Sequence, residues 1–275
     1  MHRLEGSRRF DLHMHSTRSD GAFDPEAVIE AAARGGLDVV AITDHDLATD
    51  FAFGPRTVGG RQLVVLPGAE ISGTHEGIEY HLLVYFPHDV PRAFHEFCQE
   101  RCRERAARFD AGVASIGLSD LPSADELARD GKRSLTRHHL ARALIDKGHA
   151  KNLRDAFQRF AGDRIGHVPH VSLSFVEAIR VAREVGGVTS WAHPQVEAMR
   201  QHLGTFVAAG LHAVEGHRPN ISSADRKKTK TLAKQHGIFL TGGSDWHGWH
   251  DKALGLFHVE RVDLQPFLAA LAAVA

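Results

Sequence analysis

The chain has 275 residues, of which 43% are hydrophobic and 24% are charged, as in an ordinary soluble globular protein. Its formal net charge at pH 7 is −1, which excludes an overall basic field that could hold long nucleic acid, so we expect no stable complex of that kind. No run of 18 apolar residues occurs and the two cysteines make no disulfide framework, so we expect a cytoplasmic protein without a membrane span.

The first predicted elements are a strand over 9–13 and a helix over 24–36. Asp24 is the expected N-cap of this helix, Pro25 suits its first position, and the glycine pair at 35–36 ends it. A short strand followed by one helix is typical of the first half of a βαβ unit.

Two histidines follow the first strand in the stretch FDLHMHSTRSDG, residues 10–21. In an extended strand the side chains of residues i and i+2 point to the same face, so His13 and His15 can hold one object together. Asp20 follows them in a polar turn. Taken alone, the pattern fits two solvated histidines at a strand end equally well, so the rest of the chain must decide.

Three further strands are predicted over 37–43, 61–68 and 78–86. The segment 47–60 stands where a crossover helix would be expected. It contains Pro55 and three glycines, which favours an ordered loop over a regular helix.

The pattern then changes to successive helices without strands, predicted over 91–117, 123–130, 135–148 and 152–160. We expect a helical insertion over 89–167 that caps the site, and a barrel made of 1–88 and 168–275. The basic stretches 101–110 and 225–234 have the spacing of solvated helix faces.

The last part of the chain alternates between helices and strands. Helices over 174–187, 196–210 and 223–237 are followed by strands over 188–192, 211–216 and 238–243. This alternation favours parallel βαβ units in a closed or nearly closed barrel.

Residues that can bind a metal ion gather at the predicted strands. They are His13, His15, Asp44, His45, Asp46, Glu70, His81, His193, Glu215, His217, Asp245 and His247. The carboxyl ends of parallel barrel strands emerge on one face, so these residues predict a centre for two or three divalent ions. Imidazoles together with carboxylates suit Mn²⁺, Zn²⁺ or Fe²⁺, whereas Mg²⁺ and Ca²⁺ prefer oxygen ligands. A carboxylate such as Glu70 can bridge two ions, and such a centre favours hydrolysis of phosphate esters.

The motifs DLHMHSTRSDG, AITDHD, PGAEIS, YHLL, WAHP, VE and GGSDWH occur in this order over residues 10–250. Together they resemble the PHP (polymerase and histidinol phosphatase) superfamily of metal-dependent phosphoesterases. The resemblance implies an α/β fold, a distorted (β/α)₇ barrel with two or three bound ions. It implies one ion held by His13, His15, Glu70 and Asp245, a second by Glu70, His81 and His193, and a third by Asp20, His45 and His247.

Within the superfamily, HSxxSDG and TRHHLARAL resemble most the bacterial branch of 3′,5′-nucleotide bisphosphate phosphatases and RNase AM exonucleases. This implies a small phosphorylated substrate, hydrolysed at the 3′-phosphate of a 3′,5′-bisphosphonucleotide or at the 5′ end of a short oligoribonucleotide, with Mn²⁺ as the favoured metal. The alternatives are a phosphatase of histidinol phosphate or of a cyclic phosphate, and a catalytically silent PHP binding module.

Arg137 and His138 fall where that branch has substrate-facing residues, and the planar guanidinium of an arginine suits phosphate oxygens. The sequence departs from the branch at two places. AGDRIGHVPH lacks the usual lysine, which Arg164 or His167 could replace, and EGHRPNI puts Arg218 where the branch has a histidine.

The resemblance also suggests catalytic roles. Asp245 would orient the attacking hydroxide, and Arg218 or Arg137 would neutralise the phosphoryl oxygens. The expected donor of the proton to the leaving group is His217, where the branch has a tyrosine, or His193, which ligation of a metal ion would occupy.

Overall fold

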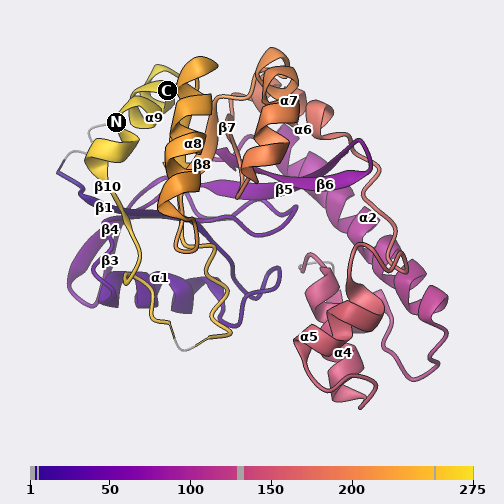
Figure 1. Ribbon diagram of the computed structural model, residues 1–275. Helices are drawn as coiled ribbons and strands as arrows, with labels where there is room; N and C mark the ends of the chain where they lie inside the picture. Colours follow the sequence, from indigo (N-terminus) through magenta and orange to yellow (C-terminus); the bar gives the residue numbers. More distant parts are fainter. Residues whose placement is uncertain (1–3, 5, 129–132, 251, 275) are drawn as a thin grey trace.

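The computed structural model describes residues 4, 6–128, 133–250 and 252–274, and its strands form two five-stranded sheets (Figure 1). The first sheet has the order β10-β1-β2-β4-β3, made of Val259–Glu260, Arg9–Met14, Val39–Ile42, Arg61–Val65 and Gly54–Val58. The second has the order β5-β6-β7-β8-β9, made of Gly68–His75, Ile78–Tyr85, Val188–Trp191, Ala213–His217 and Phe239–Gly242.

The two sheets meet on both sides. On one side Met14 forms an isolated bridge with Trp246, next to the backbone N–H of Asp245, which donates to the carbonyl of His13 at 2.8 Å. On the other side His45 forms an isolated bridge with Glu70. The fold is therefore a distorted α/β barrel, the class expected from the sequence.

Strand direction agrees only in part with the predicted parallel βαβ units. β1, β2 and β4 are parallel neighbours, as are β7, β8 and β9, but β6 runs antiparallel to both β5 and β7. Only two residues, Glu76 and Gly77, join β5 to β6, and both have a positive φ, of 48° and 74°. A parallel pair needs a crossover of a dozen residues or more, so this short connection forces a hairpin.

The segment predicted as a loop before the third strand contains β3, so that prediction was wrong there. β3 pairs antiparallel with β4 through a turn at Gly59 and Gly60, whose φ values are 57° and 79°. The glycines that suggested an irregular backbone thus form a hairpin turn. The strand predicted next is divided at Pro67, which has no N–H to donate to a strand ladder.

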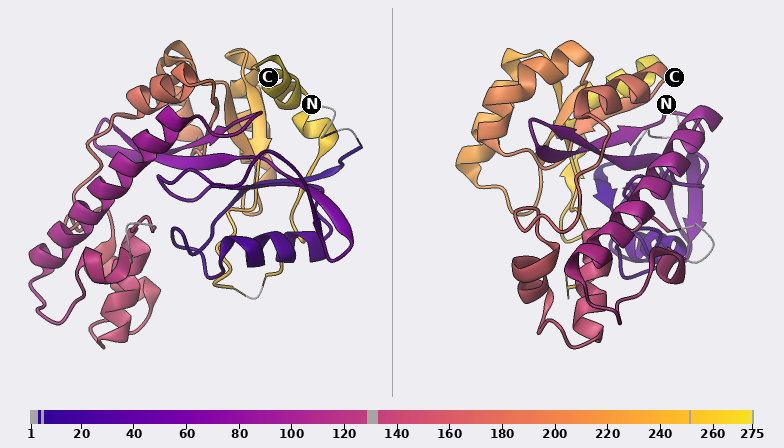
Figure 2. Two further views of the ribbon diagram at one scale, coloured as in Figure 1. Left: turned by 180° about the vertical axis from the view of Figure 1, so that it is seen from behind. Right: turned by 90° about the vertical axis from the view of Figure 1, so that its right-hand side faces the viewer.

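Helices cover the outer faces of the sheets (Figure 2). α1 (Pro25–Arg34) packs Val28 and Ile29 against β2 and β4, and Asp24 caps it by accepting the backbone N–H of Ala27 at 2.9 Å, as predicted. The later helices are α6 (Phe175–Glu184), α7 (Val196–Ala209), α8 (Ser223–Gln235) and α9 (Arg261–Val274). Among the described residues, no helix is long and apolar enough to cross a membrane.

A group of helices stands between β6 and α6. They are α2 (Arg92–Ile116), α3 (Ala124–Ala128), α4 (Arg137–Asp146), α5 (Leu153–Ala156) and the π-helical turn η2 (Phe157–Ala161). Phe109, Leu140 and Leu144 belong to a hydrophobic cluster that these helices share. At its other end α2 places Phe94 and Cys98 in the core behind the second sheet, so this long helix connects the group to the barrel (Figure 2).

Candidate metal centre

The end of β1 brings two imidazoles together inside the barrel. His13 and His15 are fully buried with ring centroids 5.2 Å apart, so the alternative of solvated histidines is wrong. Their Nε2 atoms lie 3.4 and 3.2 Å from Oδ1 of Asp245, which follows β9 with a φ of 54°. Gly243 permits this approach, because a Cβ there would lie 2.4 Å from the backbone nitrogen of His13.

Glu70 occupies the middle of the cluster. It is fully buried at the start of β5. Its two carboxylate oxygens lie 3.1–3.3 Å from five imidazole nitrogens, those of His13, His15, His45, His81 and His193. A carboxylate surrounded in this way can bridge neighbouring ions, the role that the resemblance implies for it.

His81 and His193 reach this carboxylate from strands β6 and β7. His81 lies opposite Ser72 in the β5–β6 hairpin, and Ser72 shares a strand face with Glu70. His193 follows β7 with a φ of 32°, and its backbone N–H donates to Oε2 of Glu215 at 2.8 Å. The antiparallel β6 therefore supplies its histidine from within the strand, whereas β7 supplies one just beyond its end.

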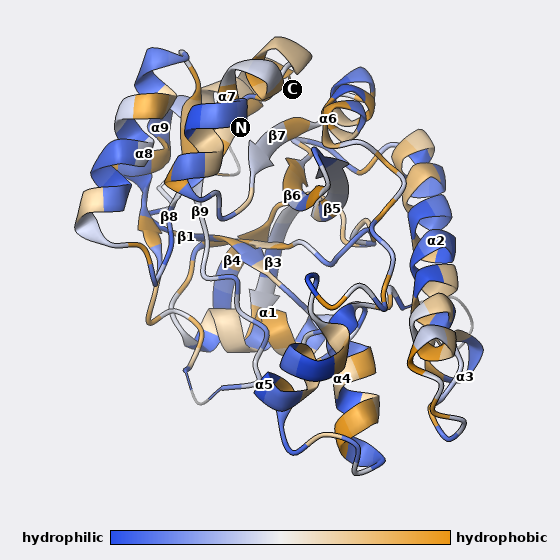
Figure 3. Ribbon diagram, turned by 45° about the vertical axis from the view of Figure 1, so that its right-hand side comes forward, coloured by the Kyte–Doolittle hydropathy of each residue, from blue (hydrophilic) through white to orange (hydrophobic). Residues whose placement is uncertain are grey.

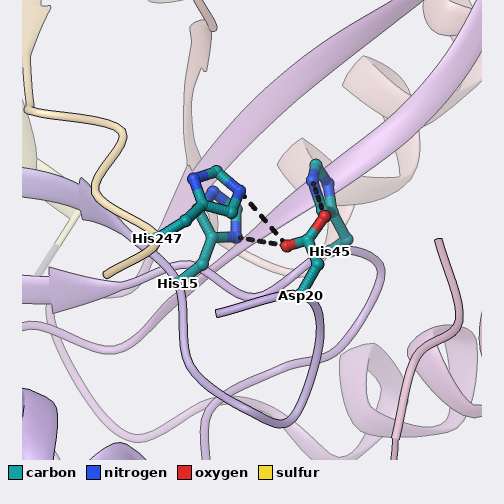
Figure 4. Close-up of side chains that lie close together, drawn as sticks. All are labelled: His15, Asp20, His45 and His247. Carbon is teal, nitrogen blue, oxygen red and sulfur yellow. Dashed lines mark ion pairs between the residues drawn. The ribbon is translucent and has the colours of Figure 1, made fainter. Parts of the chain in front are cut away.

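A second concentration of donor atoms surrounds Asp20 (Figure 4). Its Oδ1 lies 3.2 Å from Nε2 of His247 and 3.8 Å from Nδ1 of His15, and its Oδ2 lies 3.6 Å from Nε2 of His45. The turn that carries Asp20 requires Gly21, because a Cβ there would lie 2.6 Å from the carbonyl oxygen of His15. All nine predicted ligands thus lie in one continuous cluster.

The cluster contains many buried polar atoms without a hydrogen bond among the described residues. They are Nε2 of His13 and His15, Nδ1 of His45 and His81, Oδ1 of Asp20, and both carboxylate oxygens of Glu70. An unsatisfied buried polar group costs about 1–3 kcal/mol, so such a set is unfavourable unless something else uses the lone pairs. The unpaired atoms are imidazole nitrogens and carboxylate oxygens that face one another, and this donor set fits transition-metal ions.

The carboxylates of the cluster are in the ionised form that binds cations. Burial alone would raise the pKa of Glu70, but the neighbouring imidazoles, including those of His13 and His45, hold it well below its usual range. Burial also opposes ionisation of Asp20, yet His45 and His247 hold its pKa well below the usual range. The anionic charge is therefore present at neutral pH.

Two buried carboxylates stand behind the cluster and orient it. Oε1 of Glu215 lies 3.0 Å from Nδ1 of His13, which leaves the Nε2 of that imidazole free to face Glu70. Asp44 accepts hydrogen bonds from the backbone and hydroxyl of Ser16 and from the hydroxyl of Ser19, and so fixes the turn before Asp20. The sequence marks both carboxylates as candidate ligands but does not separate this positioning role from ligation.

We expect Glu215→Gln to weaken metal binding about 10–100-fold while leaving the fold intact. The glutamine has no charge, and its amide presents an N–H₂ to either His13 or the backbone N–H of His193. Titration with Mn²⁺ followed by calorimetry measures the change, with Glu197→Gln on the exposed face of α7 as the control. Equal affinity in the two variants would contradict the positioning role.

A cavity of about 160 Å³ opens beside the cluster, between the barrel and the helical group. Its barrel side is formed by Asp20, His45, Glu79 and His81. Its other side includes three arginines, Arg105, Arg108 and Arg137. Thr136 and His138, on either side of Arg137 in the chain, line it as well. Cationic side chains therefore face the donor cluster across a space suited to an anion.

Two of these arginines were predicted to be solvated, and that prediction was wrong. Arg105 is 6% exposed and Arg108 is 8% exposed, although α2 is hydrophilic over much of its length (Figure 3). Arg105 pairs with Asp46 and donates to the hydroxyl of Ser72 at 2.7 Å. Arg108 donates to Oε2 of Glu79 at 2.8 Å. Arg105 and Arg108 thus pack against the barrel, whereas Arg103 in the same stretch faces solvent.

Arg137 is held differently from its two neighbours. It is the first residue of α4, its guanidinium lies 3.8 Å from Oε1 of Glu79, and it pairs with Asp163. Arg105 and Arg108 also donate to backbone carbonyls, those of Leu135 and Pro169. Among the described residues, the side chain of Arg137 forms ion pairs with carboxylates and no hydrogen bond to a backbone carbonyl. An incoming anion can therefore replace these carboxylates without breaking a backbone contact.

A wider groove of about 1070 Å³ also reaches the cluster, and its lining includes His193, Arg218, Asp245 and His247. Arg218 is held there by a hydrogen bond to the carbonyl of Pro194 at 3.0 Å. His138 from α4 lies against Trp249 with ring centroids 5.1 Å apart, at the edge of the same groove. The groove thus offers aromatic surface and one arginine next to the donor cluster.

The structure does not bring three other predicted residues to the cluster. Arg164 is exposed in the segment after η2, and His167 pairs with the hydroxyl of Ser115 at 2.8 Å. Burial lowers the pKa of His217, and the charged groups that act on it lie on α9 and α8, namely Asp263, Arg226 and Lys230. His217, at the end of β8, lines neither the cavity nor the groove.

The N-terminal cap of α4 contains a group that can titrate, the imidazole of His139. Its Nδ1 accepts the backbone N–H of Thr136 at 3.0 Å and completes a capping box, which requires the neutral imidazole. Burial lowers its pKa from 6.5 to about 4. The resulting stabilisation, on the order of 3 kcal/mol, is fully present above pH 6.5 and is lost as the pH falls towards 4.

We expect His139→Gln to flatten this part of the pH profile of stability, because glutamine can also close a capping box but does not titrate. Urea unfolding of the metal-free protein between pH 7 and pH 4 measures the effect. His236→Gln, at an exposed histidine after α8, is the control and should keep the wild-type slope. A wild-type slope in His139→Gln would contradict the assignment.

Comparison with known proteins agrees with this geometry. The family model described as PHP domain matches residues 11–187. The 5′-3′ exoribonuclease Rnm of Escherichia coli K12 is 30% identical over 250 residues, which cover 86% of this chain and 85% of that protein. The 3′,5′-nucleoside bisphosphate phosphatase of Chromobacterium violaceum is 29% identical over 265 residues, covering 93% and 92% of the two chains.

A solved structure from Bifidobacterium adolescentis, described as a metal-dependent phosphoesterase, superimposes with a TM-score of 0.76 and 26% identity over 94% of this chain and 95% of that one. The family match covers more than half of the chain and includes the segments that supply Glu70, Asp20 and the first four imidazoles of the cluster. The chain therefore belongs to the PHP domain family and is a metal-dependent phosphoesterase.

Proposed function

We propose that this phosphoesterase hydrolyses phosphate esters of nucleotides, either the 3′-phosphate of a 3′,5′-bisphosphonucleotide or the 5′ end of a short oligoribonucleotide. The observation that carries the proposal is the arginine-lined cavity directly against Asp20, His45 and His81. Activities of these two kinds are named for the relatives from C. violaceum and E. coli. The net charge of −1 favours a small substrate over long nucleic acid.

The cluster would hold two or three divalent ions, and its mixture of imidazoles and carboxylates favours Mn²⁺, with Zn²⁺ or Fe²⁺ as alternatives. The proposed ligands are His13, His15, Asp20, His45, Glu70, His81, His193, Asp245 and His247. When bound, the ions would supply Lewis acidity and activate water near neutral pH. Glu70 contributes the central negative charge that holds cations close together.

The remaining roles follow from position. Arg137 binds phosphoryl oxygens in the cavity, and Arg218 binds them from the groove, because each guanidinium presents a planar set of donors. Asp245 orients the attacking water, since its carboxylate is partly exposed at the edge of the groove. His138 and Trp249 offer ring faces to a nucleobase. The insertion over 89–167 caps the cavity and excludes bulk water from it.

The test is phosphate release from adenosine 3′,5′-bisphosphate by Mn²⁺-loaded protein, with a 5′-phosphorylated short oligoribonucleotide, histidinol phosphate and a cyclic nucleotide phosphate in parallel. We expect the first two to be hydrolysed, and the activity to be absent in His13→Ala. Hydrolysis of only histidinol phosphate or the cyclic phosphate would overturn the nucleotide proposal. Metal-loaded protein without activity on any of the four would favour a different phosphate ester.

A further inference from the structure

A second group of metal-competent side chains lies outside the centre described above. His75 ends strand β5, Glu76 follows it in the hairpin turn, and His202 lies on α7. One donor atom from each residue lies within 4.8 Å of the donor atoms of the other two. The imidazoles of His75 and His202 approach edge to face, with ring centroids 4.9 Å apart.

This group lies on the opposite side of the sheet from the central cluster. Alternate residues of a strand point to opposite faces, so His75 shares its face with Ile71 and Gly73, whereas Glu70 and Ser72 point into the barrel. Gly73 confirms the outward direction, because a Cβ there would lie 2.7 Å from the Cα of Phe175 on α6. The two groups of donors are therefore separate sites.

His202 is buried without a polar partner. It is 6% exposed, and the described residues provide only ring contacts to its imidazole, from His75, Tyr80 and Phe206. Packing against aromatic rings does not use the lone pair or the N–H of this imidazole, so its nitrogens remain available to a ligand. The position of this imidazole beside His75 therefore calls for a ligand between them.

Glu76 supplies the negative charge at the same place. Its carboxylate lies 4.0 Å from Nε2 of His75. The glutamate has a φ of 48° in a position where a tight hairpin turn favours glycine or asparagine. Its carboxylate is mostly exposed, so an ion can enter from solvent.

We propose that His75, Glu76 and His202 form a peripheral Zn²⁺ site that ties the β5–β6 hairpin to α7. Two imidazoles and one carboxylate are a common protein donor set for Zn²⁺, with water in the fourth position. Because β5 carries Glu70 and β6 carries His81, an ion at the tip of this hairpin steadies both strands of the central cluster from outside the barrel. The site has no role in bond cleavage.

The test is the zinc content of the whole protein, measured by atomic emission after equilibrium dialysis against buffered zinc of rising concentration. We expect His75→Gln and Glu76→Gln each to bind one zinc fewer per chain than wild type and to keep phosphoesterase activity. Glu76 is exposed, so its variant retains the fold even if changes at the histidines disturb it. His258→Gln removes a histidine outside both donor groups, which contacts Glu260 and Arg9, and is the matched control.

A second readout is the unfolding temperature with and without zinc. Zinc should raise it more in wild type and in His258→Gln than in His75→Gln or Glu76→Gln, because the extra ion binds only the folded hairpin and helix. Equal zinc content and equal zinc-dependent stabilisation in all four proteins would overturn the proposal. This outcome would leave the central site and its nucleotide substrate unaffected, since those are tested by phosphate release.

Discussion

Glu70→Gln should lower phosphoesterase activity by about 10³-fold or more and remove metal from the central cluster. The carboxylate is fully buried and faces five imidazoles, so it is the one negative charge that all parts of the cluster share. Glutamine has nearly the same shape but no charge, and its N–H₂ group would point a donor at imidazole nitrogens that must bind cations.

Metal content and phosphate release, measured on the same preparation, distinguish the loss of metal from the loss of activity. Glu100→Gln, at an exposed glutamate of α2, should match wild type in both. A Glu70→Gln protein that kept its full metal content but lost activity would assign Glu70 to the reaction and not to ligation. Full metal content together with full activity would contradict the proposed ligand set.

The arrangement of the central cluster follows from short-range features that a sequence displays. His13 and His15 are two residues apart in a strand, and the strand period places them on one face whatever the rest of the chain does. Gly21 and Gly243 are needed because a Cβ at either position would collide with the backbone of His15 or His13. Both glycines are close in the sequence to the carboxylates of the motifs, Asp20 and Asp245. For these reasons the structure gathers all nine predicted ligands.

Strand direction could not be predicted in the same way. A period of two looks identical in a parallel and an antiparallel strand, and the turn at Glu76 and Gly77 lacks the asparagine or aspartate that usually indicates a hairpin. The sequence therefore places His81 inside a predicted strand and not at its end, where the other predicted ligands lie. Only the reversal of β6 explains why this mid-strand position faces the cluster.

The cationic wall of the cavity was also hidden in the sequence. The arginines of α2 recur at intervals that suit a solvated helix, and neither charge nor spacing distinguishes an arginine that faces water from one that faces a buried carboxylate. Their partners, Asp46 and Glu79, come from strand ends that lie 59 and 29 residues away from Arg105 and Arg108. Such pairing depends on the tertiary fold.

Arg105→Met should destabilise the protein by about 3–5 kcal/mol. The side chain is buried and joins α2 to three places at once, Asp46, the hydroxyl of Ser72 and the carbonyl of Leu135. Methionine fills much of the volume but leaves Asp46, which is 1% exposed, without its cation. An unpaired buried carboxylate accounts for most of the expected loss, and urea unfolding of the metal-free protein measures it.

Two further variants show whether the loss comes from the charge pair. Arg103→Met removes an exposed arginine two residues earlier in α2, which pairs only with Glu100 among the described residues, and should change stability by less than about 1 kcal/mol. Adding Asp46→Asn to Arg105→Met should restore part of the stability, because the neutral amide no longer needs a cation. If the two changes were additive, so that the double variant was less stable than Arg105→Met, the charge pair would not explain the loss of stability. The loss would then come from the contacts of Arg105 with Ser72 and Leu135. The contact with Leu135 anchors the start of α4, and hence Arg137 beside the cavity.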